Sequence, residues 1–205
     1  MTERATPDDI LRTYDTGAEV FARERNRTLF EKANLDRMLG VTPRNDGPRR
    51  LLDLGCGPGV PIARYLAERG MAVTGVDGAA GMITLFRQNL PDAEAIHADM
   101  RTLDLGPRFD AILAWHSFFH LPPDDQRAMF DIFARHAAPR AALMFTTGPE
   151  AGEAYGHAAG GPVYHASLSP DEYRDCLDKA GFNVLAFRPD DPECDRSTVW
   201  LARAR

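Results

Sequence analysis

The segment that carries the most chemical information is LLDLGCGPG, residues 51–59. An apolar strand that runs into clustered glycines and then into a helix brings the backbone close to a ligand, beside a helix N-terminus. The spacing departs from the dinucleotide-binding fingerprint, because the third glycine of that motif would fall on Val60. Asp53, two residues before Gly55, is not part of that fingerprint either. The pattern therefore argues against a nicotinamide-dependent oxidoreductase.

Two further carboxylates follow predicted strands. Asp77 ends the segment VTGVD, where a carboxylate can accept hydrogen bonds from both hydroxyls of a ribose; the alternative is an N-cap for a helix that starts at Ala79. Asp99 and Met100 follow the next strand. The carboxylate could hydrogen-bond an adenine, and the apolar side chain could stack on it. The alternative for Asp99 is a turn residue, since Asp is common in turns.

Two histidines lie in WHSFFHL, residues 115–121. His116 and His120 have the four-residue separation of zinc-binding helices, but no third ligand is evident, so we expect no metal. His120 is a candidate general base or substrate contact. The alternative is a partly buried histidine that holds a loop in place.

The glycine-rich stretch from Thr147 to Ser167 is expected to be a loop that closes over a site, with Tyr164 and His165 as its best-placed functional groups. The alternative is a mobile surface loop with incidental aromatic residues.

The first 40 residues are expected to form one or two amphipathic helices, from about Pro7 to Leu39. Their Tyr14 could contact a bound molecule, and Arg23 or Arg27 a carboxylate. The alternative is a helix that packs its phenylalanines on the sheet and leaves its arginines in solvent.

These residues need a framework, and the chain from residue 50 onward alternates short apolar runs with helical stretches. We expect strands at residues 50–54, 71–76, 94–97, 109–114, 141–146, 182–188 and 197–203. We expect helices at residues 60–68, 79–89, 124–137 and 170–180, the last capped by Ser169. This rhythm predicts an α/β fold with a parallel sheet covered by helices on both faces, and the turn-rich segment PDDPEC predicts an antiparallel hairpin at the end.

Composition narrows the class of protein. The chain has 205 residues and a formal net charge of −6, which suits one globular domain and disfavours nucleic acid as a partner. No stretch approaches the ~20 apolar residues of a membrane span. The three cysteines are an odd number and lie far apart, and residues 1–12 do not have the pattern of a signal peptide, so we expect a cytoplasmic protein. We expect a monomer or homodimer that acts on a small molecule.

Taken together, LLDLGCGPG, VTGVD and HADM resemble three motifs of the class I S-adenosylmethionine-dependent methyltransferases of small-molecule, bacterial type, and the resemblance covers about residues 50–147. It implies a Rossmann-like, seven-stranded sheet of order 3-2-1-4-5-7-6 with strand 7 antiparallel. It implies S-adenosyl-L-methionine as cofactor. The cofactor-binding positions implied by the resemblance are Asp53, Gly55, Cys56, Gly57, Gly59, Asp77, Gly78, Asp99, Met100 and Trp115.

The function that follows as an expectation is methyl transfer to an O or N atom of a small-molecule acceptor by in-line displacement. The catalytic candidates are His120 and His165, and the substrate-binding candidates are Tyr14, His116 and Tyr164. The alternative is a non-catalytic S-adenosylmethionine or S-adenosylhomocysteine sensor or scaffold. We expect a single methyltransferase domain over residues 1–205. Its parts would be a helical cap (1–42), a cofactor-binding core (49–147), a lid or substrate loop (148–168) and a C-terminal helix with a strand hairpin (169–205).

Overall fold

The structure is a computed structural model that describes residues 5–44 and 46–205. Residues 1–4 of the expected cap and residue 45 lie outside the described residues. Among the described residues, no helix has the length and apolar character needed to cross a membrane.

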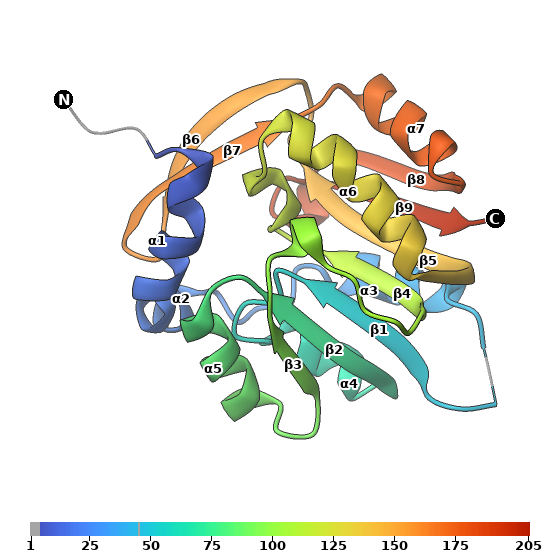
Figure 1. Ribbon diagram of the computed structural model, residues 1–205, viewed down its shortest axis with the longest axis horizontal. Coiled ribbons are helices and arrows are strands. Elements are labelled where there is room, and N and C mark those ends of the chain that lie inside the picture. Colours follow the sequence, from blue (N-terminus) through green and yellow to red (C-terminus); the bar gives the residue numbers. More distant parts are fainter. Residues whose placement is uncertain (1–4, 45) are drawn as a thin grey trace.

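A seven-stranded sheet forms the centre of the molecule (Figure 1). Its strands are β1 (Arg49–Leu54), β2 (Met71–Asp77), β3 (Glu94–His97), β4 (Phe109–Ala114), β5 (Ala137–Thr147), β8 (Phe182–Asp191) and β9 (Ser197–Ala204). The order is β3-β2-β1-β4-β5-β9-β8, with β1 to β5 parallel and β9 antiparallel to both of its neighbours. When only the strands of this sheet are counted, the order is the expected 3-2-1-4-5-7-6 with strand 7 antiparallel, so the predicted fold is confirmed.

The central strands are buried on both faces, as their continuous apolar runs predict. All six residues of β4 are buried, and so are the last four of β1. Helices α6 (Pro123–His136) and α7 (Pro170–Lys179) cover one face; α3 (Lys32–Val41), α4 (Ile62–Ala67) and α5 (Ala80–Asn89) cover the other. Figure 1 shows α6 and α7 on the near side of the sheet, with α3 and α4 behind it. The parallel strands therefore end together at one edge, where loops can meet.

The N-terminal segment forms several short helices, more than the one or two that were expected. The 3₁₀ helix η1 (Pro7–Asp9) is followed by α1 (Ile10–Thr16) and α2 (Ala18–Glu24). They are separated at Gly17, where a Cβ atom would lie 1.9 Å from the carbonyl oxygen of Ala159. No side chain fits at that contact, so glycine allows the junction of α1 and α2 to pack directly on the neighbouring backbone.

That neighbour is a two-stranded hairpin, β6 (Gly152–Ala158) and β7 (Gly161–Ser167). The prediction of a loop over Thr147 to Ser167 is wrong for most of this stretch. The two-residue turn places Ala159 at φ 53° and Gly160 at φ 75°, which is the left-handed geometry of tight hairpin turns. The first six of the seven residues of β6 are exposed, so this strand lacks the apolar alternation by which strands are predicted. Figure 1 shows the hairpin arching from the sheet toward α1.

Candidate active site

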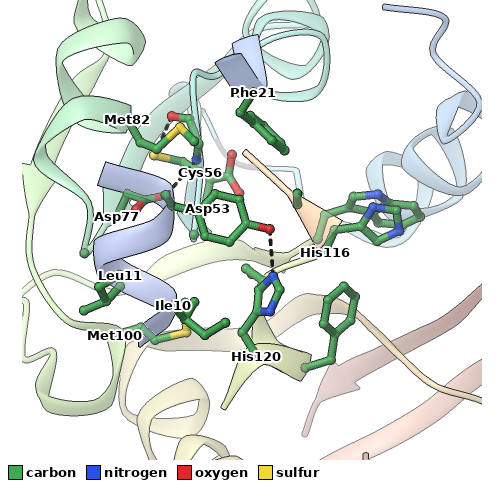
Figure 2. A pocket seen from close by; sticks show the side chains of 18 of the residues that line it. Ile10, Leu11, Phe21, Asp53, Cys56, Asp77, Met82, Met100, His116 and His120 are labelled. Atoms are coloured by element: carbon green, nitrogen blue, oxygen red, sulfur yellow. Dashed lines mark hydrogen bonds between the residues drawn. The ribbon is translucent and has the colours of Figure 1, made fainter. Parts of the chain in front are cut away.

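A cavity of about 300 Å³ lies at the carboxyl ends of the parallel strands (Figure 2). One side is formed by the loop after β1, the end of β2 and the 3₁₀ helix η2 (Met100–Thr102). The other side is formed by the segment after β4, which includes the 3₁₀ helix η3 (Phe118–His120), and by β7. Helices α1 and α2 cover the opening. The cavity is thus built where ligands bind in open α/β sheets.

The glycine loop after β1 is held by the next strand. The backbone N–H groups of Gly55 and Cys56 both donate to the carbonyl of Val76, at 2.7 and 3.0 Å. Gly55 has φ 69°, and a Cβ atom there would lie 2.2 Å from Cβ of Ser117. Because no side chain fits, the loop backbone itself forms this wall of the cavity.

Asp77 ties the end of β2 to this loop. One carboxylate oxygen accepts from the N–H of Gly57 and the other from the N–H of Ala79, each at 2.9 Å. Ala79, and not Asp77, is the N-cap residue of α5, and no side chain caps the helix, so the predicted alternative of Asp77 as N-cap is wrong. Asp77 instead bonds the N–H of the N-cap residue and lines the cavity wall. Burial raises the pKa of Asp77, although both N–H groups act against this shift.

Asp53 faces the same cavity from the end of β1, with only 4% of its surface exposed. Within the described part of the chain, no hydrogen bond or ion pair reaches its carboxylate. Burial, together with the negative charge of Asp77, raises the pKa of Asp53 to about 7, while Arg25 acts in the opposite direction. A buried carboxylate without a partner is costly, and a cationic ligand group would remove that cost.

Arg25 is one of the cavity residues that the sequence interpretation missed. Its guanidinium lies among the cavity-lining groups, 5.6 Å from the ring of Phe21 and 3.7 Å from the carboxylate of Glu31. The expected carboxylate ligands do not line the cavity: Arg23 is 70% exposed, and Arg27 lies at a separate surface pocket. Tyr14, Phe21 and Arg25 follow one another at intervals of seven and four residues, which is a helical repeat that could have identified Arg25.

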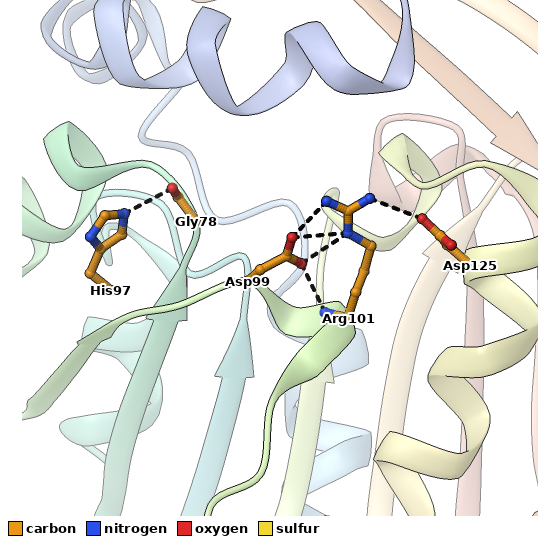
Figure 3. A network of polar contacts seen from close by, with 5 residues as sticks. All are labelled: Gly78, His97, Asp99, Arg101 and Asp125. Carbon is orange, nitrogen blue, oxygen red and sulfur yellow. Dashed lines mark hydrogen bonds and ion pairs between the residues drawn. The ribbon is translucent and has the colours of Figure 1, made fainter.

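Asp99 and Met100 line the cavity beside η2. The Asp99 carboxylate accepts the backbone N–H of Arg101 at 2.9 Å and chelates its guanidinium, which also pairs with Asp125 at 3.1 Å (Figure 3). Burial alone would raise the pKa of Asp99, but the hydrogen bonds from Arg101 outweigh it and lower the pKa. Both oxygens of Asp99 are therefore held in a fixed orientation beside the cavity. In the same figure, His97 donates to the Gly78 carbonyl at 3.0 Å, at the cavity edge.

His120 connects three segments. Its Nδ1 lies 2.7 Å from the carbonyl oxygen of Tyr164 on β7, and its Nε2 lies 2.9 Å from the hydroxyl of Tyr14 on α1. The ring is buried, which lowers the pKa of His120 to about 4 despite the bond to Tyr164. The imidazole is therefore neutral near pH 7. These bonds fit the alternative of a histidine that holds segments in place, and the same ring lines the cavity.

The other histidine candidates lie beside it. His165 packs 4.8 Å from the His120 ring and 4.9 Å from the Phe119 ring, measured between centroids. His116, at φ 49°, is exposed and bonds Ser197 through Nε2 at 2.9 Å. Phe119 also lines the cavity, and the sequence interpretation did not single it out.

Trp115 and Tyr164 differ in whether their side chains reach the cavity. Trp115 lines the cavity as expected, and its indole Nε1–H is buried without a hydrogen-bond partner among the described residues. Tyr164 does not reach the cavity with its side chain: its hydroxyl donates to Glu153 at 2.8 Å, within the hairpin. The prediction of Tyr164 as a side-chain ligand is therefore not supported by its position, because alternation along β7 turns its ring away from that of His165. Its backbone carbonyl instead fixes His120.

Over residues 5–44 and 46–205, no group of three or more His, Cys, Asp or Glu side chains is arranged to hold a metal ion. The remaining predicted residues Gly57, Gly59, Gly78 and Cys56 all lie in the cavity wall.

Comparison with known proteins adds to this geometry. A family model described as a methyltransferase domain matches residues 21–186. The chain is 37% identical over 105 residues to the dTDP-3-amino-3,6-dideoxy-alpha-D-glucopyranose N,N-dimethyltransferase of Streptomyces fradiae, covering 49% of this chain and 41% of that one. It is 30% identical over 128 residues to the ubiquinone biosynthesis O-methyltransferase of Alkalilimnicola ehrlichii, covering 60% of this chain and 51% of that one. The chain thus spans about half the length, or less, of these curated relatives.

Solved structures agree on the fold. The amino pentose methyltransferase CalS10 from Micromonospora echinaspora, solved with bound SAM, superposes with a TM-score of 0.70 at 20% identity, over 100% of both chains. The magnesium protoporphyrin IX methyltransferase ChlM from Synechocystis PCC 6803, also solved with bound SAM, gives a TM-score of 0.72 at 17% identity, again over 100% of both chains.

Proposed function

Because the chain belongs to the family of methyltransferase domains, we propose that it binds S-adenosyl-L-methionine and transfers the methyl group to an O or N atom of a small-molecule acceptor. The observation that carries this proposal is that Asp53 and Arg25 both line one cavity beside the glycine loop, without an ion pair between them. A buried carboxylate without a partner and a nearby guanidinium are complementary to the ammonium and carboxylate of an amino acid.

When bound, the cofactor supplies a methyl group on a positively charged sulfur. The residues of this chain then have three tasks. Asp53 and Arg25 hold the two charged ends of the methionine moiety, and the loop containing Gly55 and Gly57 lies along it. The Asp77 oxygens keep lone pairs with which they accept ribose hydroxyls. Asp99 and Met100 contact the adenine, the first by hydrogen bonding and the second by apolar packing.

The wall formed after β4 and by β7 is proposed to hold the acceptor. Tyr14, His116, His120 and His165 would contact it, with His120 and His165 as the groups able to accept a proton. Trp115 directly follows β4 in the sequence. We assign it to contact with the sulfonium end of the cofactor. Helices α1 and α2 exclude water from the reacting groups, which favours charge dispersal in the displacement.

We further propose that residues 1–205 act as a single methyltransferase domain in the cytoplasm, as a monomer or homodimer, without nucleic acid or membrane as partner. The net charge of −6 and the covered cavity support a small molecule. The expected divisions at 1–42, 49–147, 148–168 and 169–205 remain a proposal. In this proposal residues 148–168 act as a lid, and the lid is the β6–β7 hairpin instead of a loop.

Calorimetric titration with S-adenosylmethionine, S-adenosylhomocysteine and NADH tests the cofactor. We expect micromolar binding of the first two and none of NADH. A protein that binds NADH, or binds none of the three, would contradict the proposal. The alternative function, a sensor or scaffold, predicts binding of both sulfur compounds without methyl transfer to any phenol, amine or acid in a screen.

A further inference from the structure

The acceptor compartment, defined here as the part of the cavity lined by Tyr14, His116, Phe119, His120 and His165, has aromatic walls. The rings of Phe119, His120 and His165 form a mutual cluster with centroid separations of 4.8 to 4.9 Å. Flat, weakly polar walls of this kind match a planar ring better than a flexible polyol or sugar.

The hydrogen bonds of His120 fix the position of its proton. The carbonyl oxygen of Tyr164 can only accept, so Nδ1 carries the hydrogen of the neutral ring. Nε2 then presents a lone pair, and the Tyr14 hydroxyl donates to it at 2.9 Å. In Figure 2, a dashed line marks this bond at His120. The backbone therefore sets the imidazole as an acceptor of hydrogen bonds, with its accepting nitrogen toward the cap.

The acidic groups of the cavity come from the strand ends beside the glycine loop, although the charge of Asp77 acts on Tyr14 and adds to burial in raising its pKa. Asp53, Asp77 and Asp99 come from the ends of β1, β2 and β3, next to the glycine loop. The five side chains of the acceptor compartment include no carboxylate, and burial keeps His120 neutral and Tyr14 protonated near pH 7. An amine that arrives from neutral water as an ammonium ion finds no carboxylate among these five side chains, whereas a hydroxyl arrives uncharged.

The compartment also selects among hydroxyls. The buried imidazole of His120, with its lowered pKa, is a weak base. An aromatic hydroxyl is a stronger acid than an aliphatic one, so transfer of its proton to this base costs less free energy. The group that bonds Nε2 in this structure, the side chain of Tyr14, is itself a phenol.

We infer that the methyl acceptor is a phenol whose hydroxyl takes the place of the Tyr14 hydroxyl at Nε2 of His120 and gives its proton to that nitrogen. This inference rests on the proposed function. The O–H bond of the acceptor breaks as an N–H bond forms on His120. The acceptor oxygen bonds the methyl carbon as the carbon–sulfur bond breaks, and the electron pair of that bond stays on sulfur. The proton leaves His120 for water when the cap opens.

The test compares 4-nitrophenol with 4-nitroaniline, which has the same ring and an amine in place of the hydroxyl. Each is titrated into protein saturated with S-adenosylhomocysteine, at a pH where the phenol is protonated, with calorimetry and the visible spectrum as readouts. We expect the phenol to bind at least tenfold more tightly than the aniline. We also expect labelled methyl from S-adenosylmethionine to reach the phenol and not the aniline.

Variants test whether phenol binding depends on His120. His120→Ala should weaken phenol binding at least tenfold, while His157→Ala, an exposed histidine on β6, serves as the matched control. If His120→Ala does not fold, His120→Asn keeps a donor for the Tyr164 carbonyl and should show the same loss. Tyr14→Phe should tighten phenol binding severalfold, because it removes the competing hydroxyl from Nε2.

Three outcomes overturn the inference: aniline binding as tight as phenol binding, a folded His120 variant with unchanged phenol affinity, or weaker phenol binding by Tyr14→Phe. A protein that binds S-adenosylhomocysteine but not the phenol overturns it as well. Failure of the proposed function has a separate signature, since such a protein does not bind S-adenosylhomocysteine in the first titration.

Discussion

The hydroxyl of Tyr14 lies 2.9 Å from Nε2 of His120, although 106 residues separate them in the chain. Through Nδ1 the same imidazole bonds the carbonyl of Tyr164, so one ring joins the cap, the segment after β4 and the hairpin. Closure of the cap and the orientation of His120 are therefore physically coupled.

This coupling predicts the effect of Tyr14→Phe on the protein without ligands. The variant leaves Nε2 of His120 without its donor and should lower the free energy of unfolding by about 1–3 kcal/mol. Proteolytic cleavage within the first 25 residues should also become faster, since the cap opens more often. Urea denaturation and timed proteolysis measure the two effects. Tyr155→Phe, at a tyrosine that is 47% exposed, is the control, and equal behaviour of the two variants would contradict the coupling.

Asp53 predicts a pH dependence of cofactor binding. With its pKa raised to about 7, Asp53 is protonated in the ligand-free protein at lower pH, and only the carboxylate pairs with an ammonium group. The affinity for S-adenosylmethionine should therefore fall by up to about tenfold per pH unit as the pH drops below that value. Calorimetry between about pH 8 and pH 6 measures the slope. Asp53→Asn should bind weakly with a reduced slope, whereas Asp92→Asn, on an exposed turn, should behave as wild type.

The same carboxyl group predicts a gain in stability on substitution. The pKa of Asp53 is about 7 in the folded protein, against an ordinary value of 3.8, so the folded state holds the proton more tightly. The contribution of Asp53 to the free energy of unfolding is fully present at pH values below the pKa of the unfolded state. It is lost as the pH rises through the pKa of the folded state. Asp53→Asn should therefore raise the free energy of unfolding by about 1–3 kcal/mol near pH 8 and by much less near pH 4. Denaturant unfolding without ligand at both pH values decides this, and a destabilised variant near pH 8 would contradict it.

Asp77 holds the glycine loop and is the proposed ribose ligand. Its substitution should therefore lower the affinity for the cofactor through both roles. Asp77→Ala removes the acceptor for the Gly57 and Ala79 N–H groups, and with it the proposed ribose contact. We expect cofactor binding weaker by about 1–3 kcal/mol. Asp77→Asn retains one acceptor oxygen and should lie between wild type and Asp77→Ala. Unchanged affinity in the alanine variant would refute the ribose assignment.

Arg25 and Arg23 form a matched pair for testing the carboxylate contact. Arg25 lines the cavity, while Arg23, two residues earlier, is 70% exposed. Arg25→Ala should weaken S-adenosylmethionine binding at least tenfold, through loss of a charge-assisted hydrogen bond of about 1.5–3 kcal/mol. Arg23→Ala should bind like wild type. The assignment fails if the two variants have the same affinity.

The sheet was predictable because its strands carry their own local signals. β3 and β4 have the bounds expected from sequence, Glu94–His97 and Phe109–Ala114. A continuous apolar run such as FDAILA is typical of a strand buried on both faces, and glycine or proline marks where such runs end. The glycine loop and Asp77 were predictable for the same reason, since they lie directly at strand ends.

The acceptor compartment was less predictable because it depends on contacts between distant segments. The exposed β6 has no apolar period, and its tight turn uses Ala159 where asparagine or aspartate is usual. The bonds of His120 to Tyr14 and to the carbonyl of Tyr164 require the cap and the hairpin to meet, which spacing along the chain does not encode. Side-chain candidates on these segments could be named, but their orientation could not.

The direct packing of Gly17 on the Ala159 carbonyl has a consequence for how acceptor preference changes in evolution. The strand ends proposed to bind the cofactor are fixed by the core of the sheet, whereas α1 and β7 contact each other outside that core. Substitutions in α1 and β7 can therefore change the shape of the acceptor compartment while the cofactor-binding strand ends stay the same. On the proposed function, new acceptors would then arise by joint drift of the cap and the hairpin, with Gly17 as the position that must stay constant.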